Sequence, residues 1–254
     1  MNKLTRASLP VVIAACISAC SSTPKVNESS NPAELYTAAK EELVSGNYSG
    51  AVEAYERLEA RFPYGRYAQQ AQLEVAYAYY QQRELGSAIA ACDRFIKLNP
   101  NHPSVDYAYY LKGLSLENAD RGWMSWLSRE DMSERDPKAT QEAFESFREV
   151  VTRYPSSRYA PDARKRMETA VAGLANHGLV VARYYLNRRA PLAAANRAQA
   201  LIKTYPGSAS TEEALGIMIT AYGELGLQSL QDDARRVLKL NYPNSRFMNG
   251  VSKS

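Results

Sequence analysis

Apolar residues recur every three or four positions along most of the chain, a spacing that predicts amphipathic helices. The first such stretch, positions 32–61, carries its apolar set at Leu35, Ala39, Leu43, Ala51, Tyr55 and Leu58. Gly46 and Asn47 interrupt this pattern, so we expect one helix over 32–44 and a second over 49–61. Nowhere do β-branched residues alternate with polar ones for any length, which favours an all-α fold.

The helical stretches end at a recurrent step in which an aromatic or polar residue precedes proline. These steps are Phe62-Pro63, Asn99-Pro100, Tyr154-Pro155, Tyr205-Pro206 and Tyr242-Pro243. The first and the last pair of prolines are each 37 residues apart, whereas the inner gaps of 55 and 51 residues contain insertions. The period predicts an elongated tetratricopeptide-repeat solenoid of about five helix-turn-helix repeats, each burying its apolar face against its neighbours.

Small residues where paired helices cross support this assignment. The second repeat places Ala76 and Ala88 at the crossing, with Tyr79 and Phe95 packed around them. The third repeat uses Gly113, after which its first helix continues into an insertion, 117–136. This insertion contains both tryptophans of the chain, Trp123 and Trp126, which either cap a neighbouring apolar edge or contact a partner.

The fourth repeat is expected to begin at Pro161 with a helix to about Asn176, a break at His177-Gly178, and two further helical stretches, 179–186 and 192–204. Its first helix carries a basic cluster, Arg164, Lys165 and Arg166, which is either a solvated face or a partner-binding face. The last repeat draws its apolar set from Ala214, Ile217, Ile219, Tyr222, Gly226, Ala234, Val237 and Leu238.

The expected domain organisation follows from these boundaries. Repeats 1–3 occupy 32–158 and repeats 4–5 occupy 159–247. We expect the remaining residues, 248–254, to form a polar tail that frays.

The start of the chain has the features of a bacterial lipoprotein signal. Residues 1–19 combine a basic start, an apolar stretch and small residues before Cys20. Cys16 fits the same lipoprotein box, but choosing it would shorten the apolar region to about six residues, below the usual minimum. We therefore expect lipidation at Cys20, with a diacylglycerol thioether and an N-acyl chain, followed by a flexible tether over 20–31. Ser21 fits sorting to the outer membrane.

The net charge bears on which partners the protein can have, and the cysteine positions bear on how its fold is stabilised. Removal of the signal, with Lys3 and Arg6, lowers the formal net charge from +4 to +2, which gives no electrostatic case for nucleic acid as a partner. Cys92 is the one mature cysteine besides Cys20, and it stands on an apolar helical face as a small core residue. Stability must therefore come from packing alone.

Motifs for catalysis or metal binding are absent from the sequence. It contains no glycine-rich phosphate loop, paired-cysteine motif or nucleophile elbow, and its two histidines, His102 and His177, lie in different repeats. We therefore expect no enzyme activity, no metal and no cofactor other than the lipid.

Tyrosine is unusually frequent, with 18 residues against five phenylalanines. Many of these rings belong in the core, but helical spacing turns several toward the concave side of the solenoid. A groove lined by tyrosines suits an extended peptide with aromatic side chains. The residues expected to line it are Gln70, Leu73, Tyr77, Tyr80, Tyr107 and Tyr110.

Several motifs together resemble the BamD family of outer-membrane assembly lipoproteins. The most specific is the run from Asp93 to Pro103, and the resemblance extends from the signal sequence through all five repeats. Other matching stretches are Arg61 to Gly65, Gln69-Gln70, Tyr77 to Tyr80, Asp106-Tyr107, Gly113-Leu114, Arg135 to Pro137, Ala143-Phe144, Tyr184-Tyr185 and Asn196-Arg197. The insertion around Trp123 and Trp126 departs from the family pattern.

The resemblance implies a scaffold of the β-barrel assembly machinery, held in the inner leaflet of the outer membrane and facing the periplasm. It implies that the N-terminal repeats recognise the C-terminal β-signal of unfolded outer-membrane proteins. The C-terminal repeats would dock on the POTRA domains of the barrel subunit BamA, with Arg197 linked to that docking. BamC- and BamE-type lipoproteins are further expected partners.

Two other classes of protein compete with this reading. Another tetratricopeptide lipoprotein, serving cell-wall synthesis or pilus assembly, would share the repeats and the anchor, and copurification of a peptidoglycan synthase would favour it. A periplasmic hydrolase would need a nucleophile and a base, which the sequence does not offer.

Overall fold

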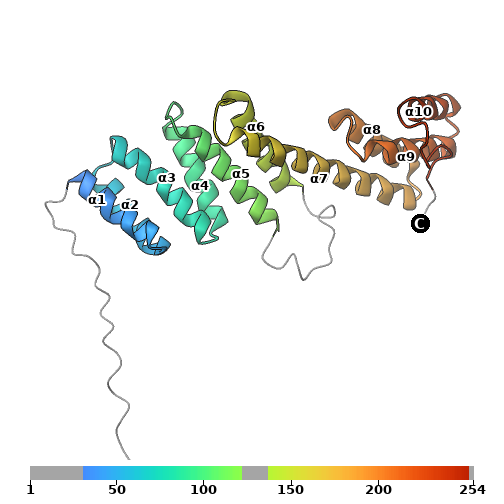
Figure 1. The fold of residues 1–254 in the computed structure, drawn as a ribbon. Helices are drawn as coiled ribbons and strands as arrows, with labels where there is room; N and C mark the ends of the chain where they lie inside the picture. Colours follow the sequence, from blue (N-terminus) through green and yellow to red (C-terminus); the bar gives the residue numbers. More distant parts are fainter. Residues whose placement is uncertain (1–30, 122–136, 252–254) are drawn as a thin grey trace, which may run out of the picture.

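The computed structural model describes residues 31–121 and 137–251, and every regular element in these two ranges is an α-helix (Figure 1). The expected all-α class is confirmed. The helices are α1 (Pro32–Val44), α2 (Tyr48–Arg61), α3 (Arg66–Gln81), α4 (Leu85–Leu98), α5 (Val105–Arg121), α6 (Lys138–Arg153), α7 (Ala160–Asn187), α8 (Pro191–Thr204), α9 (Thr211–Glu224) and α10 (Gln228–Asn241). Cys16, Cys20, Trp123 and Trp126 lie outside the described residues.

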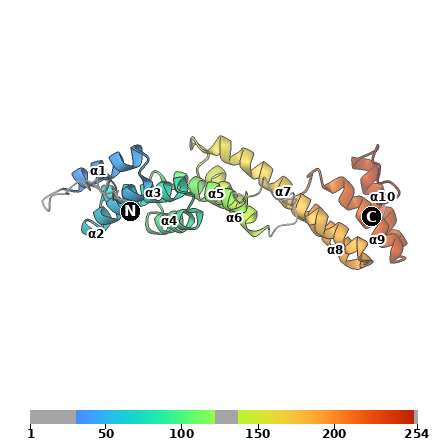
Figure 2. The ribbon, with the colours of Figure 1, turned by 90° about the horizontal axis from the view of Figure 1, so that it is seen from below.

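In the described residues, the ten helices form five consecutive pairs along an elongated body, with α1 at one end and α10 at the other (Figures 1 and 2). Each helix packs against the next along the chain, and first helices of adjacent repeats also touch, α1 with α3, α3 with α5 and α7 with α9. The fold is a solenoid of tetratricopeptide type. Alanines at the crossings are fully buried, as expected, namely Ala39, Ala51, Ala76, Ala88, Ala182, Ala194 and Ala198.

The aromatic-proline steps end helices as expected. Phe62 and Tyr154 leave the helical region, with φ near −130°, because a following proline disfavours the helical conformation. Each still donates its backbone N–H to the carbonyl four residues earlier, over 2.8 Å from Phe62 and 3.0 Å from Tyr154. At the other end of the first hairpin, Asn31 and Glu34 form a reciprocal capping box around Pro32.

The turns inside four of the hairpins share a left-handed residue. Gly46 and Gly226 hold this position in the first and last hairpins, with φ of 84° and 69°. Arg83 and Arg189 hold it in the second and fourth, with φ of 64° and 57°. In each case the turn returns two N–H groups to carbonyls of the preceding helix, which satisfies the helix end. Such a conformation costs a residue other than glycine about 1–3 kcal/mol.

The expected helix break at His177-Gly178 is wrong. α7 runs without interruption from Ala160 to Asn187, so the stretches 161–176 and 179–186 are one helix. Gly178 provides a close approach to another helix: a Cβ atom built on it would lie 3.3 Å from Cδ1 of Leu201 on α8. The glycine therefore allows a tight helix crossing. The prediction failed because glycine occurs both in turns and at close helix crossings.

The expected polar tail also needs correction. Met248 and Val251 pack against the last repeat, and the Val251 N–H donates to Oγ1 of Thr220 over 2.8 Å. The chain is therefore docked at least to Val251. Val237, expected in the core of the last repeat, is 42% exposed.

The crossing at Gly113 gives a direct test of the packing. A Cβ atom at Gly113 would lie 2.5 Å from the Phe147 ring, whereas one at Gly173 on α7 would meet nothing within 4 Å. Gly113→Ala should destabilise the protein by about 1–3 kcal/mol through overpacking. Gly173→Ala should stabilise it by up to about 1 kcal/mol through helix propensity alone. Urea unfolding followed by circular dichroism measures both, and equal effects of the two substitutions would contradict this packing.

Candidate functional site

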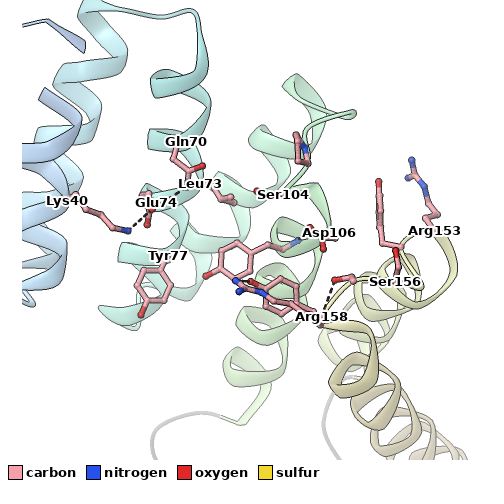
Figure 3. A pocket seen from close by; sticks show the side chains of 15 residues that line it. Lys40, Gln70, Leu73, Glu74, Tyr77, Ser104, Asp106, Arg153, Ser156 and Arg158 are labelled. Atoms are coloured by element: carbon pink, nitrogen blue, oxygen red, sulfur yellow. Dashed lines mark hydrogen bonds and ion pairs between the residues drawn. The ribbon is translucent and has the colours of Figure 1, made fainter. Parts of the chain in front are cut away.

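A groove of about 870 Å³ lies on the N-terminal half, bounded by α3, the start of α5 and the α6–α7 loop (Figure 3). Four of the six residues expected in a peptide groove line it. They are Gln70, Leu73, Tyr77 and Tyr107. Figure 3 shows Lys40, Glu74 and Tyr77 on one side and Arg153, Ser156 and Arg158 on the other.

The first wall is organised around the carboxylate of Glu74 on α3. It accepts hydrogen bonds from Lys40 Nζ at 2.7 Å, Tyr36 Oη at 3.2 Å and Gln70 Nε2 at 3.3 Å. Burial, followed by the charge of Glu74, raises the pKa of Tyr36 to about 12. The phenol therefore remains a hydrogen-bond donor at neutral pH, and the bonds tie α1 to α3 at the edge of the groove.

The middle of the groove combines a buried leucine with two tyrosine rings in contact. Leu73 is 3% exposed, so it supports the groove from below. The ring of Tyr107 lies 5.2 Å from that of Tyr159, measured between centroids, and burial raises the pKa of Tyr107 well above its usual range. Both rings offer apolar area that carries a hydroxyl.

The second wall comes from the loop that closes the third repeat. The Arg158 guanidinium stacks over the ring of Tyr159, 4.8 Å from its centroid, and donates to its phenol oxygen. Among the described residues, Arg158 has no carboxylate within ion-pair distance, although Asp106 lines the same groove. Arg153 differs, because it pairs with Glu149 at 3.1 Å. Arg158 is therefore a fixed cation that is open to a ligand.

The structure places Tyr80 and Tyr110 outside the groove lining, contrary to expectation. The Tyr80 hydroxyl accepts from Asn118 Nδ2 at 3.0 Å. Tyr110 stacks on Tyr159 at 4.8 Å between centroids and donates to Asp162 Oδ2 over 2.6 Å. Both residues therefore hold neighbouring helices together, and Tyr110 positions the groove ring of Tyr159.

Sequence reasoning missed the second wall, although its signal was present. From its proline, the run Arg-Tyr-Pro-Ser-Ser-Arg-Tyr predicts only the end of a helix. Its second arginine stacks on the aromatic residue that follows it, and the same pair recurs at Arg66–Tyr67 and Arg246–Phe247, each at 4.7 Å. An arginine followed directly by an aromatic residue in these loops therefore indicates an exposed arginine side chain that stacks on its neighbour.

The other expected site residues lie outside the groove lining. Arg197 on α8 is exposed and lies 6.0 Å from the centroid of the Tyr185 ring. Of the basic cluster on α7, Arg166 is engaged by Asp162 and Glu117, which links α7 to α5. Arg164 and Lys165 remain exposed.

The described residues show neither a metal cluster nor a spanning helix. In 31–121 and 137–251, no group of three or more His, Cys, Asp or Glu side chains could hold a metal ion. Within the same ranges, no helix combines the length and the apolar character needed to cross a bilayer. Cys92 is fully buried, and burial raises the pKa of its thiol to about 12.

Comparison with known proteins gives the family. A family model described as an outer membrane lipoprotein, YfiO, matches residues 28–238. The chain is 46% identical over 246 residues to the outer membrane protein assembly factor BamD of Neisseria meningitidis serogroup B, which covers 94% of this chain and 92% of that one. The chain belongs to the BamD family. The BamD of Vibrio cholerae is 39% identical over 222 residues, or 87% of this chain and 92% of its own.

Comparison with solved structures gives distant matches. The crystal structure of MamA matches with a TM-score of 0.41 and 16% identity, covering 79% of this chain and 90% of MamA. A thermophilic tetratricopeptide protein of Thermus thermophilus matches with a TM-score of 0.39 and 13% identity, covering 86% and 95%. For this BamD-family chain, the fold assignment rests on its own helices.

The Tyr110–Asp162 bond gives a test of how the groove is held. The hydrogen bond from Tyr110 lowers the pKa of the Asp162 carboxyl, so the bond should persist at pH 7 and weaken as the pH falls through that lowered value. A double-mutant cycle of Tyr110→Phe and Asp162→Asn should give a coupling energy of about 0.5–1.5 kcal/mol at pH 7. Additive effects on urea unfolding would contradict the bond.

Proposed function

We propose that this chain is a non-enzymatic scaffold in outer-membrane protein assembly, whose groove holds the C-terminal β-signal of unfolded outer-membrane proteins. Membership of the BamD family supports the general role. The observation that carries the finer claim is the pairing of a groove that contains tyrosine rings with Arg158, a cation that forms no ion pair with a carboxylate among the described residues.

The groove chemistry fits an extended peptide that ends in an aromatic residue. Such a peptide presents alternate side chains to one face, and an aromatic side chain would rest against Tyr107 and Tyr159. Its terminal carboxylate would then meet Arg158, since a guanidinium binds a carboxylate through two parallel hydrogen bonds. Gln70 and Ser156 line the groove and can hydrogen-bond to the backbone of the peptide.

The second half of the proposal concerns assembly. The C-terminal repeats dock on the POTRA domains of a BamA-type barrel subunit, with exposed Arg197 in that interface, and BamC- and BamE-type lipoproteins join the complex. A lipid on Cys20 holds the chain at the inner leaflet of the outer membrane, facing the periplasm. The scaffold then works through binding energy and through the folding of its client, with no chemical step of its own.

Binding of a fluorescent peptide tests the groove. The peptide is the last ten or so residues of an outer-membrane barrel protein, prepared with a free C-terminal carboxylate and as the C-terminal amide. Amidation should weaken binding to the wild-type protein by about tenfold, because a charge-assisted bond to Arg158 is lost. Against Arg158→Gln the two peptides should bind equally, and a persistent preference for the free carboxylate would contradict the assigned role of Arg158.

A matched pair of tyrosines controls for general loss of aromatic surface. Tyr77 lines the groove, whereas Tyr64 is 91% exposed in the α2–α3 loop and does not line it. Tyr77→Ala should weaken binding of the free peptide while Tyr64→Ala leaves it unchanged. If neither substitution changes the affinity, the groove is not the peptide site.

A further inference from the structure

An arginine and two tyrosine rings meet at the starts of α1 and α3. The Arg66 guanidinium lies 4.7 Å from the centroid of the Tyr67 ring and donates to the Tyr67 phenol oxygen over 2.9 Å. The Tyr67 ring in turn lies 5.6 Å from the Tyr36 ring, measured between centroids. Tyr36, Arg66 and Tyr67 are named the N-terminal unit here. Arg66 is exposed, so its guanidinium is held by the ring and faces solvent.

The N-terminal unit repeats the arrangement of the second groove wall. There, Arg158 lies 4.8 Å from the centroid of the Tyr159 ring, and the rings of Tyr159 and Tyr107 are 5.2 Å apart. In both places one tyrosine lies on the first helix of a repeat, and the Arg-Tyr pair follows the loop that closes the same repeat. The wall that faces a ligand in the third repeat is therefore duplicated in the first.

The surroundings leave the charge of Arg66 available. Residues 62–73 contain no aspartate or glutamate. The nearest carboxylates in the sequences of α1 and α3 are already bonded, because Glu34 takes part in the cap of α1 and Glu74 pairs with Lys40 at 2.7 Å. Within 31–121 and 137–251, Arg66 itself forms no ion pair. An anionic group can therefore approach it without displacing a carboxylate of the protein.

The N-terminal unit adjoins the groove. Arg66 is four residues before Gln70 on α3, and Tyr36 is four residues before Lys40 on α1. Gln70 and Lys40 both line the groove (Figure 3). Residues four apart lie on one face of a helix, about one turn of ~5.4 Å apart. The unit therefore continues the first wall of the groove by one turn on two helices.

We propose that the N-terminal unit binds an acidic side chain within the client peptide, upstream of the terminal residue held at Arg158. A guanidinium that is fixed by a neighbouring ring presents its donors to a carboxylate, whether that group is terminal or on a side chain. The client then lies with its C-terminus at the third repeat and its upstream residues at the first. The inference rests on the proposed function and adds a specificity-determining residue, Arg66.

Helix spacing gives the position of this acidic residue in the client. α1 touches α3 and α3 touches α5. Packed helices are about 8–10 Å apart, so α1 and α5 are about 16–20 Å apart, and an extended strand covers that span in about five or six residues. Every second side chain of a strand points to the same face. The acidic residue therefore belongs about six residues before the terminal aromatic residue.

A peptide series with one movable acidic residue tests this inference. The fluorescent peptide with a free C-terminus is prepared with glutamine at every acidic position, and then with a single glutamate placed from three to eight residues before the terminus. Fluorescence anisotropy gives the affinity for the full mature chain. Glutamate about six residues upstream should strengthen binding about three- to fivefold over glutamine at low salt, and less at high salt.

Arginine substitutions separate the two contacts of the peptide. Arg66→Gln should abolish the preference for glutamate and keep the preference for a free over an amidated C-terminus, and Arg158→Gln should do the reverse. Arg246→Gln is the matched control and should change neither, since Arg246 stacks on the next ring at 4.7 Å but does not line the groove. Tyr67→Phe removes the hydroxyl that accepts from Arg66. It should weaken the preference for glutamate while circular dichroism shows unchanged helix content.

Three results would overturn the proposal in distinguishable ways. If the preference for glutamate survives Arg66→Gln, or if Arg246→Gln removes it as well, the N-terminal unit is not the site, and the groove stands as long as the effect of amidation depends on Arg158. If neither glutamate nor the terminal carboxylate affects binding, the proposed function falls too. If the preference depends on Arg66 but is greatest three residues before the terminus, the proposed direction of the client is wrong.

Discussion

The structure depends on a steric constraint: proline disfavours the helical conformation of the residue that precedes it, so helices usually end at that residue. Phe62, Tyr154, Tyr205 and Tyr242 each end a helix in this way, which fixes the length of the hairpin and the direction of the loop that follows. In the third repeat the same loop carries Arg158 and Tyr159 to the groove. The residues that stop the helix and the residues that face a ligand therefore belong to one short segment.

The two proposed binding surfaces are joined by a single helix. α7 begins directly after Tyr159, on the wall of the groove, and ends at Asn187, three residues before Ala190 in the turn that leads into α8. Tyr110 and Arg166 tie the start of this helix to the third repeat, and Gly178 lets α8 pack closely against its later part. A solenoid can in this way hold a client and a partner on separate repeats, each with its own local packing.

The sequence was sufficient to predict the helical period, the stops at proline and the small crossing residues, because each has a local steric cause. It failed where one residue type has two uses. Gly178 was expected to break a helix, and only the neighbouring Leu201 shows that it serves packing. Tyr80 and Tyr110 have helical spacing like that of Tyr77, yet Asn118 and Asp162 draw them into contacts between helices. Such partners lie on other repeats, beyond the reach of a local pattern.

The most direct test of the account is whether the two surfaces act at once. The fluorescent β-signal peptide and the periplasmic fragment of the barrel subunit are added together to the mature chain, and the sedimentation of the labelled peptide is followed by analytical ultracentrifugation. The account predicts that the peptide sediments with a complex of all three components. Displacement of the peptide as the fragment binds would show a shared site and would contradict the account.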